Sequence, residues 1–160
     1  MKAYVYIETT IPSFYCETRP QPEMVARRNW TRQWWDTCRQ AYELVTSAAV
    51  FDELNLAPPQ KAVEMLDLIR PLPRLARTDP VEALARHYIA EKVMPANLGG
   101  DAMHLALATY YRCHFLLTWN CTHLANAHKT KHLQAIHRRR NLPSPVLATP
   151  LELLNFTHHA

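Results

Sequence analysis

Short apolar runs recur along the chain and have the composition of β-strands. The clearest is residues 3–7, Ala-Tyr-Val-Tyr-Ile, which combines β-branched with aromatic side chains. Residues 114–118 form the most apolar run, His-Phe-Leu-Leu-Thr, which favours a central place in a sheet. Further strands are expected at 42–46 and 145–149, and a weak one at 75–78.

The segments between these runs carry signals for helices. Helix starts are indicated by Thr9 and Pro12, by Ser47 as an N-cap, and by the pair Pro58-Pro59. In two of the helices, apolar residues at near-helical spacing are expected to face the core. These residues are Val63, Leu66 and Ile69 in one helix, and Val81, Leu84, Ala85, Tyr88 and Ile89 in the other. The expected helices cover residues 22–40, about 50–54, 58–69, 79–93, 101–112 and 124–139.

The alternation of strands and helices predicts the fold class. Because the most apolar strands have no in–out pattern, we expect a mainly parallel sheet that helices cover on both faces. This is a three-layer α/β/α architecture. The length of 160 residues suits a single domain over residues 1–160, and no repeat or linker divides the chain. Only two glycines occur, Gly99 and Gly100, which argues against an all-β fold and against a Gly-rich phosphate loop.

Composition narrows the functional classes only a little. The formal net charge of +4 and the pI near 9.0 permit a polyanionic partner without requiring one. Four cysteines without a CxxC pair are expected to be reduced thiols. No apolar run approaches the roughly 20 residues of a membrane span, and the N-terminal residues do not resemble a signal peptide. We therefore expect a cytoplasmic protein without membrane segments.

Four polar residues are positioned to meet at one edge of the predicted sheet. Glu8 directly follows the first strand, Asn120 follows the strand at 114–118, and Glu53 and Asp101 lie on helices that neighbour strands. In an open parallel sheet, ligands bind beyond the carboxyl ends of the strands. Each residue taken alone also fits a turn, a helix cap or a charged helix face, so position by itself does not decide between these roles.

Long segments around these residues resemble the acidic motifs of PIN-domain proteins. The segments are Tyr-Ile-Glu-Thr-Thr-Ile-Pro-Ser-Phe-Tyr at 6–15, Val-Phe-Asp-Glu-Leu at 50–54, Gly-Asp-Ala-Met-His-Leu-Ala at 100–106, and Leu-Leu-Thr-Trp-Asn-Cys-Thr-His-Leu-Ala-Asn at 116–126. The resemblance spans residues 4 to about 155 and is strongest for VapC-type toxins that open with Glu-Thr-Thr-Ile-Pro-Ser. The second segment is short and adds little by itself.

This resemblance implies a metal-dependent endoribonuclease that cleaves single-stranded RNA with Mg²⁺ or Mn²⁺. Glu8, Glu53 and Asp101 take the first three acidic places, and Asn120 takes the fourth, which is often an aspartate. Glu8 also departs from the commoner aspartate, so its carboxylate reaches one methylene further. The resemblance further implies the toxin half of a toxin–antitoxin pair, with a cognate antitoxin and a homodimer. The alternative is a PIN-fold binding or regulatory module that hydrolyses nothing.

The chemistry of phosphodiester hydrolysis suits these residue types. A divalent cation activates water and compensates charge on the phosphate, and hard cations prefer oxygen ligands. Two carboxylates about 4 Å apart repel by roughly 4 kcal/mol at an effective dielectric constant near 20, so converging acids favour a bound cation. Because Asn120 is neutral, we expect one tightly bound ion. Thr9, Thr118 and His104 are supporting candidates, and His104 fits a structural histidine better than a ligand.

Two other groups of residues suggest binding roles less strongly. His123, His128 and His132 have spacings that fit zinc, but the basic helix around them favours a solvated face. Arginines interleaved with Trp30 and Trp34, together with the basic stretch 129–140, are candidates for RNA contacts. For both tryptophans, burial in the core or in an oligomer contact is favoured over base stacking.

Overall fold

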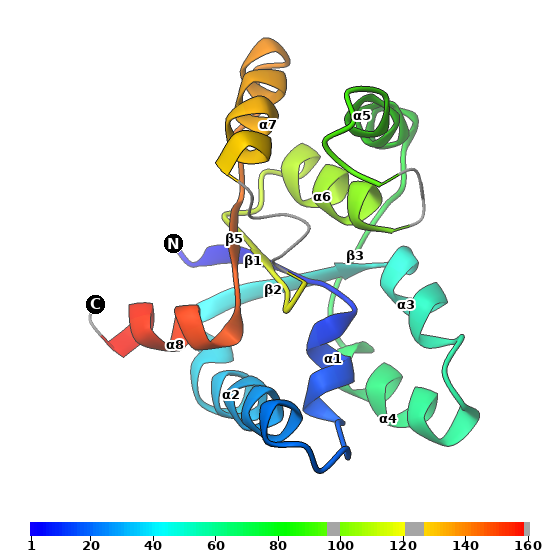
Figure 1. The fold of residues 1–160 in the computed structure, drawn as a ribbon, viewed down its shortest axis with the longest axis vertical. Coiled ribbons are helices and arrows are strands. Elements are labelled where there is room, and N and C mark those ends of the chain that lie inside the picture. The colour runs from blue at the N-terminus through cyan, green and yellow to red at the C-terminus, as the bar shows by residue number, and fades with distance from the viewer. Residues whose placement is uncertain (96–99, 121–126, 159–160) are drawn as a thin grey trace.

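A computed structural model describes residues 1–95, 100–120 and 127–158 of the chain. The sheet is five-stranded and entirely parallel, with the strand order β3-β2-β1-β4-β5 (Figure 1). The strands are β1 (Ala3–Ile7), β2 (Tyr42–Ser47), β3 (Arg74–Leu75), β4 (Phe115–Leu117) and β5 (Val146–Ala148). The expected run at 114–118 forms β4, which is interior and pairs with β1 and β5. The middle position belongs to β1.

Helices cover both faces of this sheet (Figure 1). They are α1 (Thr10–Tyr15), α2 (Pro22–Cys38), α3 (Ala48–Leu54), α4 (Pro59–Ile69), α5 (Asp79–Ala90), α6 (Asp101–Tyr110), α7 (Ala127–Arg139) and α8 (Pro150–His158), with a 3₁₀ turn at Arg39–Ala41. In the view of Figure 1, α5, α6 and α7 lie above the sheet, and α1, α2, α4 and α8 lie below it. The three-layer α/β/α prediction is thus confirmed. None of the described helices has the length and apolar character of a membrane span.

Several expected boundaries are shifted. β3 begins at Arg74 and ends at Leu75, so the prediction of 75–78 was displaced, and α8 was not predicted at all. The helix expected at 79–93 ends at Ala90, because Lys92 turns the chain with a φ of 58°. The helix expected from 124 is observed from Ala127, and residues 121–126 lie outside the described part of the chain.

The apolar face of α4 also differs from the prediction. Val63 is 55% exposed, whereas Ala62, Met65 and Ile69 are buried. Spacings of three and four residues hold these three on one face of the helix, and Val63 lies one position away, outside that face. The stripe predicted for α5 is correct for Val81, Leu84, Ala85 and Tyr88, and Ile89 is partly buried against the core.

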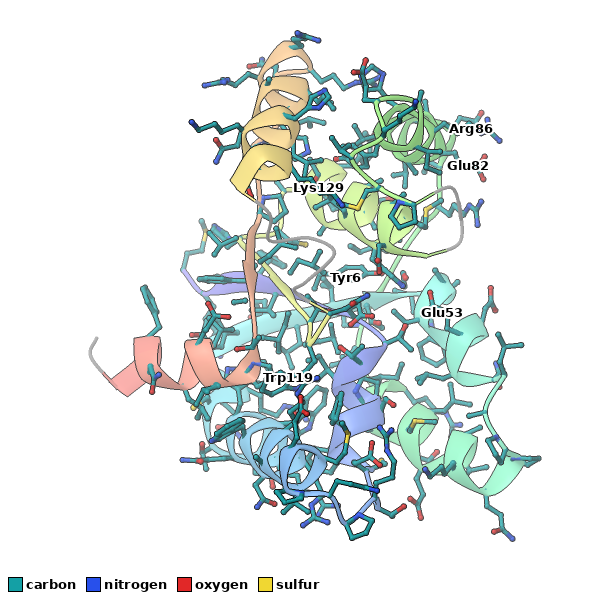
Figure 2. All side chains as sticks on the ribbon, viewed as in Figure 1. Tyr6, Glu53, Glu82, Arg86, Trp119 and Lys129 are labelled. Carbon is teal, nitrogen blue, oxygen red and sulfur yellow. The ribbon has the colours of Figure 1, made fainter. Side chains whose placement is uncertain are left out.

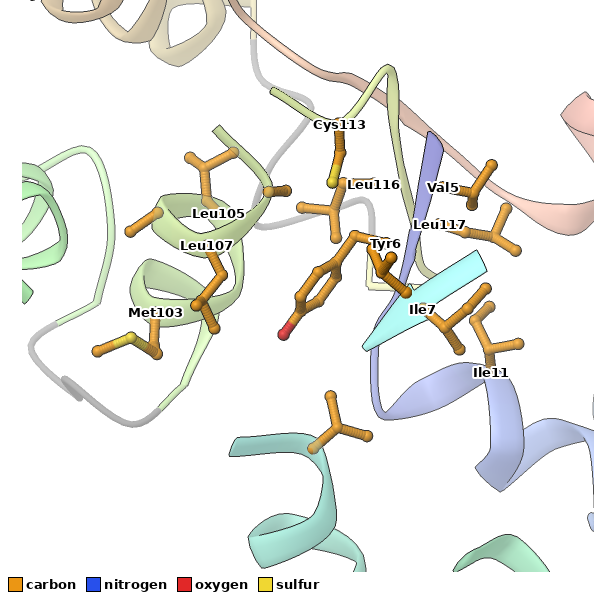
Figure 3. Close-up of a cluster of buried hydrophobic side chains, with 14 of the residues drawn as sticks. Val5, Tyr6, Ile7, Ile11, Met103, Leu105, Leu107, Cys113, Leu116 and Leu117 are labelled. Atoms are coloured by element: carbon orange, nitrogen blue, oxygen red, sulfur yellow. The ribbon is translucent and has the colours of Figure 1, made fainter. Parts of the chain in front are cut away.

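The core lies on both sides of the central strands. Figure 3 shows Tyr6 and Leu116 pointing from the sheet toward α6, while Ile7 and Leu117 point to the opposite side, toward Ile11 of α1. Every residue of α6 from Ala102 to Thr109 is buried. A helix enclosed in this way has little freedom to shift, so its first residue, Asp101, is held in a fixed position relative to the sheet.

A buried histidine fastens α7 to its neighbours. The Nε2 atom of His137 lies 2.6 Å from the hydroxyl of Tyr88, and its Nδ1 atom lies 2.6 Å from Oγ of Ser144. His137 is 2% exposed, and this burial lowers its pKa from 6.5 to about 4.

We expect this histidine to make the fold sensitive to mild acid. The unfolded chain binds a proton on His137 near pH 6.5, but the folded protein resists binding it until about pH 4. The contribution is therefore fully present above pH 6.5 and is lost as the pH falls toward 4, by about 2 to 3 kcal/mol. Urea unfolding from pH 7 to 4.5 would measure it, and NMR titration of the His137 ring gives the site-specific check. An ordinary pKa near 6.5 would contradict the prediction.

Candidate functional site

Glu8 lies buried where β1 ends, with an exposed fraction of 5%. Its Oε2 atom accepts hydrogen bonds from the backbone nitrogen of Thr10 at 3.0 Å, from the Thr10 hydroxyl, and from the Thr118 hydroxyl at 2.8 Å. Because all three bonds go to Oε2, Oε1 has no hydrogen-bond donor among the described residues. Thr10, two residues after the acid, supplies two of the donors, and Thr118, which directly follows β4, supplies the third.

The buried position of Glu8 changes its acidity. Burial raises the pKa of this carboxyl, and the positive charge favoured at His104 and the hydrogen bonds from Thr10 and Thr118 oppose the rise without cancelling it. A carboxylate in this position is therefore costly for the protein alone. A cation beside Oε1 would lower that cost.

Glu53 reaches the same place from α3 and belongs to a chain of hydrogen bonds. Its Oε2 accepts a bond of 2.6 Å from the Thr9 hydroxyl, and its Oε1 lies 2.6 Å from Nε2 of His104. The other ring nitrogen of His104 lies 2.7 Å from the Tyr6 hydroxyl, which also contacts Oγ of Ser47 at 2.7 Å. Ser47 takes the N-cap position of α3 as expected, but its hydroxyl serves Tyr6 and makes no capping bond.

The contact between Glu53 and His104 shifts both pKa values. Burial alone would raise the pKa of Glu53 and lower that of His104. Their mutual hydrogen bond and opposite charges outweigh burial, so the pKa of Glu53 falls and that of His104 rises. Ligand atoms of Glu8, Glu53 and His104 all lie within 4.8 Å of one another. Because both nitrogens of His104 already have partners, we interpret it as a residue that orients Glu53.

Asp101 and Asn120 form the other half of the predicted site. The Nδ2 atom of Asn120 lies 3.2 and 3.3 Å from the two carboxylate oxygens of Asp101. The backbone nitrogen of Asn120 also donates to the Thr118 hydroxyl at 2.9 Å, and this hydroxyl in turn bonds Glu8. Thr118 therefore connects Asn120 to Glu8. The alternative role of Asn120 as a cap involves residues 121–126, which lie outside the described part of the chain.

An open pocket of about 440 Å³ joins the two halves. Glu53 and Asp101 both line it, as do Ala49, Asp52, Leu56, Arg77 and Gly100. The four predicted residues thus form two pairs, Glu8 with Glu53 and Asp101 with Asn120, and Asp101 is not part of the group of ligand atoms within 4.8 Å that Glu8, Glu53 and His104 form. Figure 2 shows Glu53 and Tyr6 near each other. Sequence reasoning missed Thr10, Asp52 and Arg77, and only Thr10 had a local signal, because it stands two residues after Glu8.

The donors present suit a hard divalent cation. Carboxylate oxygens of Glu8, Glu53 and Asp101 and the amide group of Asn120 are the ligand types that Mg²⁺ and Mn²⁺ prefer. The amide would have to turn its oxygen to such an ion, since its nitrogen now faces Asp101. His104 adds a nitrogen within reach of Glu53, but oxygen donors predominate.

Some residues of the other predicted binding groups contact neighbours within the protein. Trp34 is fully buried, as favoured from the sequence, and Trp30 stacks on Trp119 with ring centroids 6.1 Å apart. Arg27 pairs with Glu23 at 2.6 Å and lies 5.5 Å from the centroid of the Trp119 ring. Of the three histidines considered for zinc, His132 contacts Glu91 at 3.1 Å. The side chains of His123 and His128 lie outside the described residues.

Comparisons with known proteins identify the fold. No protein-family model and no curated protein matches the sequence. A chain from the crystal structure of VapBC2 from Rickettsia felis bound to a DNA fragment from their promoter has a TM-score of 0.59 at 12% identity, covering 91% of this chain and 98% of that chain. A chain of FitAcB from Neisseria gonorrhoeae has a TM-score of 0.53 at 15% identity, covering 92% and 98%. The chain therefore has the PIN-like α/β/α fold that its acidic motifs predict.

Proposed function

We propose that the protein is a metal-dependent endoribonuclease whose ion is Mg²⁺ or Mn²⁺, held by Glu8, Glu53, Asp101 and Asn120. The observation that supports the proposal is the open pocket lined by both Glu53 and Asp101, because Glu8 has a ligand atom within 4.8 Å of one on Glu53 and Asn120 contacts Asp101. The bound ion would supply an activated water and charge compensation for the phosphate. The similarity to VapBC2 and FitAcB supports the fold on which the site is built.

The residues of the chain have distinct tasks in this proposal. Thr10 and Thr118 fix Oε2 of Glu8, which leaves Oε1 for the ion. His104, held by Tyr6, fixes the rotamer of Glu53. The buried α6 fixes Asp101, and Asn120 contacts it. Because these side chains are already held in position, they need to rearrange less when a phosphodiester substrate binds.

We expect one tightly held Mn²⁺ per chain. The site has three carboxylates, and the pKa of His104 is shifted toward its charged form, so one divalent ion balances the remaining negative charge. Isothermal titration with Mn²⁺ should give one tight site, weakened at least about ten-fold in Asp101→Asn. Asp79→Asn is the matched control, because Asp79 also begins a helix but is exposed and outside the site. Two tight sites in the unmodified protein would reject the prediction.

We further propose that the protein is the toxin of a toxin–antitoxin pair. The resemblance to VapC-type toxins supports this role, and a chain of similar fold occurs in VapBC2, which was crystallised with a promoter DNA fragment. A cognate antitoxin would bind the protein and block cleavage, and the active form would be a homodimer. Co-expression with the product of an adjacent small reading frame should give a stable complex without ribonuclease activity.

One observation favours the alternative of a non-catalytic module. Both oxygens of Glu53 and one oxygen of Glu8 already accept hydrogen bonds from the protein, and Asn120 is neutral. A site satisfied in this way could persist without an ion. The Mn²⁺ titration separates the two functions, since the module would bind no ion at millimolar concentration.

A further inference from the structure

Arg77 faces the acidic pocket from the segment that joins β3 to α5. Among the described residues that line the pocket it is the only cation, opposite the carboxylates of Asp52, Glu53 and Asp101. No ion pair connects it to any of these three acids. The position of Arg77 is therefore not explained by ion pairing with the acidic residues of the pocket.

A residue outside the pocket holds Arg77 in place. Its Nε donates to Oε1 of Glu82 at 2.8 Å, and Glu82, on the first turn of α5, also contacts Arg86 at 3.5 Å. Figure 2 labels Glu82 and Arg86 on α5, above Glu53 of α3 in that view. The guanidinium group has five N–H donors in a planar fork, and the contact with Glu82 uses only the one on Nε. Both terminal nitrogens lack a hydrogen-bond partner among the described residues.

Arg77 is paired with Glu82 outside the pocket, and within the described part of the chain its two terminal nitrogens are free to bind an anion that also contacts the ion. Arg77 repels a divalent ion in the pocket, but a phosphodiester that reaches both groups is attracted by each. A guanidinium edge with two free nitrogens matches two phosphate oxygens in a bidentate contact. We propose that Arg77 binds a non-bridging oxygen of the scissile or an adjacent RNA phosphate, and that Glu82 orients it for this contact. The inference rests on the proposed nuclease function.

The test compares three variants in Mn²⁺-dependent cleavage of a short single-stranded RNA. Arg77→Gln should raise KM by about ten- to a hundred-fold, because it removes a charge-assisted contact to the substrate. It should also reduce the slope of log Kd against log salt concentration by about 0.7, the value for one lost phosphate contact. Arg77→Lys keeps the charge without the fork and should restore binding only in part. Arg86→Gln is the matched control, because Arg86 shares Glu82 but does not line the pocket.

The Mn²⁺ affinity of Arg77→Gln distinguishes the loss of a substrate contact from a disturbance of the acidic metal site. Arg77→Gln should bind Mn²⁺ as tightly as the unmodified protein or more tightly, since a nearby positive charge is gone. Weaker Mn²⁺ binding, or a KM and salt slope equal to those of Arg86→Gln, would overturn the inference. Failure of the nuclease function is a different result, namely no cleavage by the unmodified protein. In that event the salt slope of RNA binding in Mn²⁺ still decides the role of Arg77, and absence of RNA binding also refutes it.

Discussion

Asp101→Asn is expected to lower Mg²⁺- or Mn²⁺-dependent cleavage of single-stranded RNA by at least about 1,000-fold, because loss of a metal-binding carboxylate removes several kcal/mol of transition-state stabilisation. The fold should survive, since Asp101 is at the start of α6 and contributes no apolar contact to the buried face of that helix. Cleavage of a fluorescent RNA under single-turnover conditions measures the effect, and circular dichroism verifies the fold.

Asp79→Asn again supplies the control. Asp79 is the first residue of α5 as Asp101 is of α6, so both substitutions remove the same favourable interaction with a helix N-terminus. Only Asp101 contacts Asn120 and lines the acidic pocket. Equal rates for the two variants would therefore show that Asp101 has no role in the reaction.

Glu8→Gln is expected to reduce cleavage by about a hundred-fold or more while making the metal-free protein more stable. The variant loses the negative charge of a carboxylate that is only 5% exposed and whose pKa is raised by burial. Removal of this buried charge should raise the free energy of unfolding by on the order of 1 kcal/mol at neutral pH. Urea unfolding in EDTA and cleavage in Mn²⁺ measure the two effects.

The pH dependence of the stability of the metal-free protein gives a second test of the Glu8→Gln prediction. Because burial raises the pKa of folded Glu8, the unmodified protein without metal should lose stability as the pH rises from the unfolded value of 4.5 through the folded one. Glu17 is the matched comparison, since it is also 5% exposed but pairs with Arg19 at 2.7 Å. The pKa of Glu17 falls to about 2, so Glu17→Gln should destabilise the protein above pH 4.5. A destabilised Glu8→Gln would contradict this interpretation.

The sequence predicts the layers of the fold better than its edges. Long apolar strands and strongly periodic helices, such as β1 and α5, have signals within their own residues. β3 has only two residues, and its hydrogen bonding begins with Pro73, which accepts from Thr46, so tertiary contact defines it. α8 begins at Pro150, with one residue between it and the end of β5, and packs on α2 in the folded protein, and its apolar pattern is short.

In the site, too, short sequence motifs predict some residues, whereas contacts between residues far apart in the sequence could not be predicted. The motifs around Glu8, Glu53, Asp101 and Asn120 predict that four residues meet, and the structure gives two pairs, of which Glu53 and Asp101 line one pocket. His104 was considered mainly structural, and its bonds to Tyr6 and Glu53 agree with that interpretation. These bonds span 98 and 51 residues of sequence, and Arg77 enters the pocket from another loop. No local pattern encodes such contacts.

The bond between Thr118 and Glu8 has a consequence for synthesis of the protein. These residues are separated by 110 positions, and the Thr118 hydroxyl reaches Glu8 only after β4 has paired with β1. A ribosome must therefore extend the chain beyond Asn120, and release that stretch from its exit tunnel, before the four side chains can assemble. Nascent chains and prematurely terminated products that stop before Asn120 lack part of the proposed site, and we expect them to cleave no RNA.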